Sequence, residues 1–326
     1  MSEALLTVRD LDVRFGSSRA ATHAVRGIDL DIAAGESVAI LGESGSGKSV
    51  TGKAVMGLIN PPGKVRGSVR FDGVELVGRT DEQLSDVRGA GLAMVFQDSL
   101  DALNPVFSIG DQIMEALMVR LGHTRAEARA QAISLMEQVD IANAASRLGD
   151  YPHQFSGGMR QRICIALAIA LKPRLLIADE PTTALDVTVQ AGILKLIGSL
   201  QKQTGMALLF VTHDLAVARM VARRLVVMYA GRIVEQGDID ELYARPAHPY
   251  TKALLSSNPG TARRWEDLQP ISGNPPDKSA VFTGCAFADR CPRAVPHCRE
   301  VAPALREITT GRLSRCHYAE EVLDGR

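Results

Sequence analysis

The stretch that decides the fold is SVAILGESGSGKS, residues 37–49. Its first five residues suit a short buried strand, and the pattern from Lys48 to Ile59 is helical until the breaker NPPG at 60–63. Between strand and helix, residues 42–49 match G-x-x-x-x-G-K-[ST] in full, in the structural context that this motif requires. The sequence therefore predicts an α/β fold built around a phosphate-binding loop.

The chemistry of this loop follows from its residue types. Glycines let consecutive backbone N–H groups curl around phosphate oxygens, and the N-terminus of the following helix adds a positive potential. Lys48 is expected to reach the β- and γ-phosphates of a nucleotide, and the Ser49 hydroxyl to ligate Mg²⁺. The expected nucleotide-binding residues of the loop are Gly42, Ser44, Gly45, Ser46, Gly47, Lys48 and Ser49. Taken alone, the loop leaves a kinase, a GTPase and an ATPase open.

A second acidic site narrows the chemistry. Residues 175–180, LLIADE, read as an apolar strand that ends in two carboxylates. Asp179 is placed to hold Mg²⁺ directly or through water, and Glu180 is expected to polarise the attacking water as a general base. The plainer alternative is an acidic pair that only caps a helix, which the phosphate loop upstream disfavours.

Alternating strand and helix patterns surround these two sites. The pattern predicts strands at 5–15, 25–32 and 206–212 and hairpins at 69–76 and 225–235. It also predicts a helical insert at roughly 108–147, helices at about 158–171 and at 187–203, and a helix that follows the strand 206–212 and ends at about 221. Such alternation implies a mostly parallel sheet with helices on both faces. After Gly237 the character changes to a short helix at 248–257, a Pro/Gly-rich linker at 258–283 and a final segment with little periodicity.

Composition bounds the remaining possibilities. Of 326 residues 46% are hydrophobic, and Lys+Arg equal Asp+Glu at 37 each, so no net basic field exists to hold nucleic acid. The most apolar stretch, 163–171, is far shorter than the about 20 residues of a membrane-spanning helix, and no secretory signal opens the sequence. We expect a cytosolic chain that binds no nucleic acid and reaches a membrane only by docking on a partner.

Residues 155–162, FSGGMRQR, resemble the signature motif of ABC ATPases. The resemblance extends over nearly all of residues 5–257 and includes, in family order, Gln97 at a strand end (the Q-loop), ALD at 184–186 (the D-loop) and His213 (the switch histidine). Taken singly Gln97 and His213 are weak signals, but the motifs in this order identify the class. The family implies an ATP-hydrolysing enzyme.

The resemblance also implies how the work is divided. Phe15 stacks on adenine, although an ordinary apolar strand end would look the same; Gln97 contacts Mg²⁺ and the attacking water; and His213 hydrogen-bonds the γ-phosphate. The implied catalytic residues are Glu180, His213, Gln97 and Lys48, and the implied Mg²⁺ ligands are Ser49, Gln97 and Asp179. Ser156, Gly157 and Gly158 close over the ATP of a second ATPase subunit in a head-to-tail dimer. Phe155 and Met159 depart from the commonest signature residues, and neither change removes a catalytic group.

Four of the five cysteines, Cys285, Cys291, Cys298 and Cys316, lie near the C-terminus. Their spacing does not favour a common zinc ribbon, which starts from C-x₂-C pairs, and four thiolates can equally hold an iron–sulfur cluster. Disulfides are disfavoured in a reducing cytosol but remain open, as do unligated buried thiols. Cys164 is expected to belong to the core.

Three short stretches, at 246–255, 271–276 and 284–292, resemble the C-terminal extension of oligopeptide/dipeptide importer ATPases. The resemblance implies an ABC ATPase domain at 1–257 and this extension at 258–326. The first domain has an N-terminal antiparallel β subdomain and a helical subdomain at about 98–170. In some members of the family the four cysteines carry a [4Fe–4S] cluster, which we prefer to Zn²⁺ here.

The importer family also implies an assembly and a location. A second ATPase subunit, usually a paralogue, two transmembrane permeases and an extracytoplasmic substrate-binding protein are expected, with the chain peripheral on the cytoplasmic face of the plasma membrane. ATP and Mg²⁺ are the expected cofactors, and ATP hydrolysis is expected to energise peptide import. Nickel chelates, glutathione or another small solute are the alternative cargoes. A soluble ABC ATPase outside transport predicts a coiled-coil insertion or tandem cassettes, and the sequence has neither.

Overall fold

The structure is a computed structural model that describes residues 4–16, 21–97, 102–183, 185–257 and 270–325. The chain divides into two compact units, one made of Met1–Gly78 with Phe210–Arg326 and the other of Arg79–Leu209. Two expectations lie outside the described residues: Ala184 of the expected D-loop and the first part of the linker, 258–269. The domain boundary at 257/258 and the helical subdomain at about 98–170 stay predictions.

An antiparallel sheet opens the first unit, in the strand order β2-β1-β4-β5. Its strands are β1 Ala4–Phe15, β2 Thr22–Ala33, β4 Gly63–Phe71 and β5 Val74–Glu75. The turn between β4 and β5 is Asp72-Gly73, and both residues have a positive φ, as a two-residue hairpin turn requires. The expected antiparallel β subdomain and its Asp-Gly hairpin are therefore confirmed.

A second sheet in the first unit carries the phosphate loop. β3 Ser37–Leu41 is buried at every position and pairs in parallel with β9 Arg224–Tyr229. Antiparallel pairing follows from β9 to β10 Arg232–Asp238 across the expected Ala230-Gly231 turn. Helix α1 Lys48–Val55 follows β3, and α9 Leu215–Val221 packs against β3. Strand β8 Ala207–Thr212 contains the boundary between the two units.

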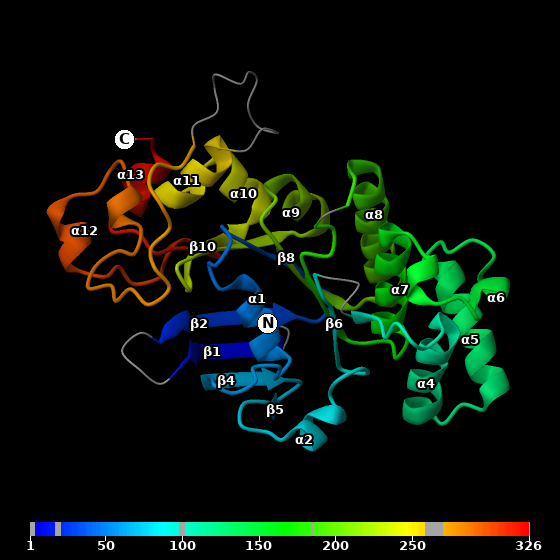
Figure 1. Ribbon diagram of the computed structural model, residues 1–326. Coiled ribbons are helices and arrows are strands. Elements are labelled where there is room, and N and C mark those ends of the chain that lie inside the picture. Colours follow the sequence, from blue (N-terminus) through cyan, green and yellow to red (C-terminus); the bar gives the residue numbers. More distant parts are fainter. Residues whose placement is uncertain (1–3, 17–20, 98–101, 184, 258–269, 326) are drawn as a thin grey trace. The chain divides into compact units, whose positions relative to one another are not determined.

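The second unit holds a parallel strand pair and a group of helices that includes the longest ones of the described residues (Figure 1). β6 Leu92–Val95 and β7 Leu175–Asp179 pair in parallel. The helices are α2 Asp81–Ser85, α4 Ile109–Leu121, α5 Arg125–Gln138, α6 Ala144–Arg147, α7 Gly157–Ile169 and α8 Val187–Thr204. Side-chain oxygens cap the N-termini of α4, α5, α7 and α8, and they come from Ser108, Thr124, Ser156 and Asp186. Each cap accepts a hydrogen bond from a backbone N–H group of the first turn, which has no partner within the helix. The helical insert and the α/β class with parallel core strands are confirmed.

The C-terminal part of the first unit is more ordered than the sequence suggests. It contains α10 Ile239–Ala244, α11 Pro249–Ser256, the 3₁₀ turn η3 Ala288–Arg290, α12 Pro296–Glu300, β11 Arg306–Thr309, β12 Arg312–Ser314 and α13 Ala319–Leu323. β12 pairs antiparallel with β10 and so adds the C-terminal segment to the edge of the sheet. Within the described residues, no helix combines the length and apolar character that crossing a membrane demands.

Candidate functional site

The phosphate loop lies between the end of β3 and the start of α1, as its motif requires. Gly45 and Gly47 have φ values of +80° and +104°, a region that residues with a Cβ rarely adopt. A Cβ on Gly42 would overlap the carbonyl oxygen of Met228, and one on Gly47 would overlap that of Ala24. These glycines are therefore needed both for the curl of the loop and for its close approach to neighbouring strands.

Lys48 and Ser46 are the two buried polar side chains of the loop. Lys48 is 4% exposed, and its Nζ donates to the carbonyl oxygens of Gly42 at 2.8 Å and Glu43 at 3.1 Å, so the ammonium spans the loop. Ser46 is also 4% exposed, and its Oγ has no hydrogen-bond partner among the described residues. A buried hydroxyl without a partner is costly, and a phosphate oxygen would satisfy it. The loop therefore fits the phosphates of a nucleotide.

The loop is tied to the C-terminal part of the same unit through Glu43. Arg290 donates two hydrogen bonds to the Glu43 carboxylate, at 2.7 and 3.0 Å, and the Glu43 backbone N–H donates to the Tyr250 hydroxyl at 3.0 Å. The paired carboxylate raises the pKa of Arg290 above its usual range, so the guanidinium stays charged. Burial raises the pKa of the Tyr250 hydroxyl, which therefore remains neutral.

The acidic pair at the end of β7 belongs to the second unit. Asp179 is the last residue of the strand and is 3% exposed, while Glu180 follows with a φ of +46°. Such a φ is strained for a residue with a Cβ, and strain of this kind gathers at functional sites. Thr183 holds Glu180 by donating its hydroxyl to Oε2 at 3.0 Å. The strand places the two carboxylates as predicted, one buried and one presented beyond its end.

The signature residues begin α7 in the second unit. Ser156 is the N-cap of this helix and accepts a hydrogen bond from the Met159 N–H at 3.4 Å. A Cβ on Gly158 would overlap the side chain of Val189 on α8, so only glycine allows the two helices to approach this closely. Phe155 is buried beneath the guanidinium of Arg147, 4.0 Å from its ring centroid. The sequence motif thus forms a helix N-terminus of the kind that binds anions.

The remaining expected site residues lie at strand or helix ends. Gln97 follows β6 in the second unit and is exposed. His213 follows β8 and is exposed, next to Asp214, which caps α9. Phe15 ends β1, half-buried opposite Gly63. Their expected roles toward ATP and Mg²⁺ stay predictions, as does the grouping of these residues with the acidic pair.

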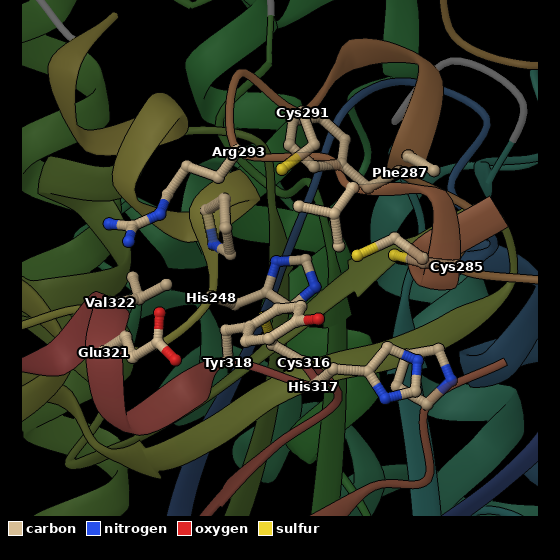
Figure 2. Close-up of a pocket in the computed structure, with 15 residues that line it drawn as sticks. His248, Cys285, Phe287, Cys291, Arg293, Cys316, His317, Tyr318, Glu321 and Val322 are labelled. Atoms are coloured by element: carbon tan, nitrogen blue, oxygen red, sulfur yellow. The ribbon is translucent and has the colours of Figure 1, made fainter. Parts of the chain in front are cut away.

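The four C-terminal cysteines line one cavity of about 320 Å³, with His248, Phe287 and Tyr318 among its other walls (Figure 2). The backbone N–H of Cys285 donates to the carbonyl of Cys298 at 2.7 Å, which joins two of the cysteine-bearing segments. None of the cysteines forms a disulfide. Burial raises the pKa of the Cys285 and Cys291 thiols, and that of Cys316 to about 11, so these three thiols stay protonated at neutral pH in the absence of a metal.

The fit of a metal to these cysteines is mixed. Four thiols around one cavity are the donor set of an iron–sulfur or zinc centre, and metal binding would deprotonate them. Yet no group of three or more His, Cys, Asp or Glu side chains in the described part of the chain is arranged to hold a metal ion. The structure therefore brings the cysteines together without showing a metal centre.

Two long-range ion pairs were missed by sequence reasoning, one at the phosphate loop and one at the edge of the sheet. The first is the pair between Glu43 and Arg290, and the second is the buried pair between Glu235 on β10 and Arg312 on β12, with 2.8 Å between Oε1 and Nη2. No local pattern could have indicated either pair, because the partners are 247 and 77 residues apart.

Two family models match the sequence, ABC transporter over residues 25–183 and oligopeptide/dipeptide transporter, C-terminal region, over residues 234–298. The dipeptide transport ATP-binding protein DppD of Escherichia coli is 48% identical over 97% of this chain and 97% of its own length. The oligopeptide transport ATP-binding protein OppD of the same organism is 42% identical over 99% and 95%.

Solved structures show the same similarity in three dimensions. The dimeric ATP-binding cassette MJ0796 bound to ADP and phosphate has a TM-score of 0.65 at 27% identity, covering 72% of this chain and 98% of its own. The protein cbiO1 of Clostridium perfringens, part of an ABC transporter complex, has a TM-score of 0.63 at 28% identity, covering 74% and 92%.

Proposed function

Because this chain belongs to the family of ATP-binding subunits of dipeptide/oligopeptide ABC transporters, we propose that it hydrolyses ATP at the site built on residues 42–49 to energise peptide import. The observation that carries the proposal is the 48% identity to a dipeptide transport ATP-binding protein along 97% of both chains. That match spans the phosphate loop and the cysteine-bearing extension together. It therefore supports the importer function as well as the ATPase chemistry.

Each expected site residue receives a role under this proposal. The loop N–H groups, Lys48 and the Ser46 hydroxyl bind the phosphates, and Ser49, Asp179 and Gln97 hold Mg²⁺. Mg²⁺ bound by these residues would supply positive charge that stabilises the negative charge developing on the β- and γ-phosphate oxygens as ADP leaves. Glu180 accepts the proton of the attacking water, and His213 hydrogen-bonds the γ-phosphate. The strained backbone of Glu180 and its bond from Thr183 support the role given to this carboxylate.

The site is completed by a second ATPase subunit. Residues 156–158 form the N-terminus of α7. The backbone N–H groups of a helix N-terminus point outward along the helix axis, so this end of α7 suits the γ-phosphate of a partner's ATP. The similar cassette MJ0796 is described as dimeric with ADP and phosphate bound. We expect a paralogue as the second subunit, two transmembrane permeases, an extracytoplasmic binding protein, and peripheral association with the cytoplasmic face of the plasma membrane.

Peptide import is tested by deleting the gene and measuring uptake of a radiolabelled dipeptide and a longer peptide, with nickel and glutathione as alternative cargoes. The wild-type gene should restore peptide uptake, and a gene carrying Glu180→Gln should not. If the deletion leaves peptide uptake intact and reduces uptake of nickel or glutathione, the ATPase function stands and the peptide cargo is wrong.

The four cysteines of the extension form a finer part of the proposal. We expect them to hold a [4Fe–4S] cluster, with Zn²⁺ as the alternative, because all four line one cavity and thiolates are ligands for both. Anaerobically purified protein should contain iron and sulfide in equal amounts. Cys291→Ser should remove them, while the core variant Cys164→Ser should keep them. Protein with neither iron nor zinc would overturn this part of the proposal.

A further inference from the structure

The phosphate loop carries one carboxylate, that of Glu43, and an arginine from the C-terminal extension pairs with it. The Glu43 side chain is 25% exposed and that of Arg290 only 6%, so solvent screens this pair weakly. Nη1 and Nη2 of Arg290 each donate to a different oxygen of the Glu43 carboxylate. This bidentate geometry is the one in which Arg binds carboxylates most strongly. The pair is therefore stronger than an exposed ion pair of the same residue types.

Arg290 is itself held in place on its other sides. Its Nε donates to the Ser272 carbonyl at 3.0 Å, and its Nη1 also lies 3.4 Å from the Tyr229 hydroxyl. The guanidinium carbon is 5.8 Å from the centroid of the Tyr229 ring. Because the surroundings fix the guanidinium before it meets the loop, little freedom is lost when the pair forms.

The charge of Glu43 is the reason that the loop needs this partner. A nucleoside triphosphate brings several negative charges to a loop whose second residue is itself an anion, and like charges at short range disfavour binding. Arg290 cancels the charge of Glu43 and at the same time fixes the outer side of the loop. The Glu43 N–H bond to Tyr250 adds a second anchor at the same residue.

We propose that Arg290 is a positioning residue for nucleotide binding, which acts through Glu43 by neutralising it and holding the loop. The C-terminal extension thereby completes the ATP site of its own chain. Arg290 lies between Cys285 and Cys291, so the segment that bears the cysteines is the one that contacts the loop. This inference rests on the proposed binding of ATP by residues 42–49.

The test measures the dissociation constant of MgATP on the full chain, by displacement of a fluorescent ATP analogue, together with the melting temperature. Arg290→Gln leaves the Glu43 carboxylate unpaired, and we expect about tenfold weaker binding, which corresponds to about 1.4 kcal/mol. Arg290→Lys keeps the positive charge but cannot make the bidentate contact, and should weaken MgATP binding by less than Arg290→Gln. The double variant Glu43→Gln with Arg290→Gln removes the unpaired charge and should bind several-fold more tightly than Arg290→Gln alone.

Arg306 provides the matched control. It makes a similar two-pronged pair with Glu320 in the same extension, but this pair is exposed and does not contact the loop. Arg306→Gln should leave MgATP binding unchanged.

Two results would overturn the inference: Arg290→Gln that binds as tightly as wild type, or a double variant that binds as weakly as Arg290→Gln. If Arg290→Gln does not fold, Arg290→Lys decides the question, because unchanged binding in that variant also overturns it. Failure of the wild type to bind MgATP would instead refute the proposed function.

Discussion

Substitution of Arg312 by Met should strongly destabilise the first unit, because it leaves a buried carboxylate without its counter-charge. Glu235 is completely buried, and the Arg312 side chain is 5% exposed. Besides Arg312, the carboxylate accepts the backbone N–H groups of Ala247 at 2.8 Å and His248 at 3.0 Å. Arg312 also donates to the carbonyl of Arg245. One ion pair therefore joins β12, β10 and the start of α11.

The magnitude follows from burial. Breaking a buried ion pair by removing one partner costs about 3–5 kcal/mol, since the remaining charge has lost both water and counter-ion. In a unit of 150 to 250 residues each kcal/mol shifts the melting temperature by about 2–4 °C. We therefore expect Arg312→Met to lower the melting temperature, measured by calorimetry or intrinsic fluorescence, by roughly 6–20 °C.

The loss should depend on pH with a definite sign. Burial raises the pKa of the Glu235 carboxyl above its ordinary value of 4.5, and the bonds from Arg312 and the backbone oppose the rise. A carboxyl whose pKa is raised on folding contributes stability below its unfolded pKa, and this contribution is lost as pH rises through the folded pKa. Removing Arg312 raises the folded pKa further. The gap in melting temperature between wild type and Arg312→Met should therefore widen from about pH 5 to about pH 8.

Two further variants separate this reasoning from a general packing defect. Arg306→Met breaks an exposed pair with Glu320 and should cost at most about 1 kcal/mol. Glu235→Gln added to Arg312→Met removes the buried charge and should recover part of the loss at the higher pH. The reasoning is refuted if Arg312→Met costs no more than Arg306→Met, or if its cost does not change with pH.

Three other substitutions test the nucleotide site. Glu180→Gln should keep MgATP binding while phosphate release at this site falls by about 10²-fold or more, the range that a general base supplies; turnover near the wild-type rate would remove Glu180 from that role. Gly47→Ala should abolish MgATP binding in an equilibrium titration, because the φ of Gly47 is +104° and a Cβ there would overlap the carbonyl oxygen of Ala24. Gly198→Ala on α8 is the control and should bind MgATP normally, because a Cβ at that position meets open space. Ser156→Ala should lower stability by about 1 kcal/mol through the lost cap of α7 and should prevent ATP-dependent association of subunits in sedimentation; association as strong as in the wild type would contradict the composite site.

Sequence patterns predicted the parts of the fold that repeat locally. The buried runs at β3, β7 and β8 and the long helix α8 were placed to within a few residues, because each has a clear period and chemical boundaries. β11 and β12 were missed, since strands of four and three residues are too short to show a period. Pairing rather than propensity sets their place at the sheet edge, since β12 pairs with the distant β10 and β11 pairs with β12.

In the candidate site, too, the local features were predicted and the long-range contacts were not. The loop glycines and the two carboxylates at the end of β7 are local features that the sequence pattern indicated, and the residues of the α7 N-terminus came from the resemblance to the ABC signature motif. The pairing of Glu43 with Arg290 was not predictable, because Arg and Glu residues are common at protein surfaces and only the folded chain shows which two form a partly buried pair.

The two long-range ion pairs of the extension should have separable effects, which follows from where each carboxylate lies. Glu235 is enclosed by the sheet edge and α11, so the loss of Arg312 acts on the folding of the unit and should appear mainly in its melting temperature. Glu43 is part of the phosphate loop and partly exposed, so the loss of Arg290 acts on an anion-binding surface and should appear mainly in the affinity for MgATP. Folded Arg312→Met protein, below its melting temperature, should therefore bind MgATP close to the wild-type affinity, whereas Arg290→Gln should lose affinity with a smaller change in melting temperature. If both variants change both quantities in the same proportion, the extension acts on the loop only through overall stability, and the specific role of Arg290 is wrong.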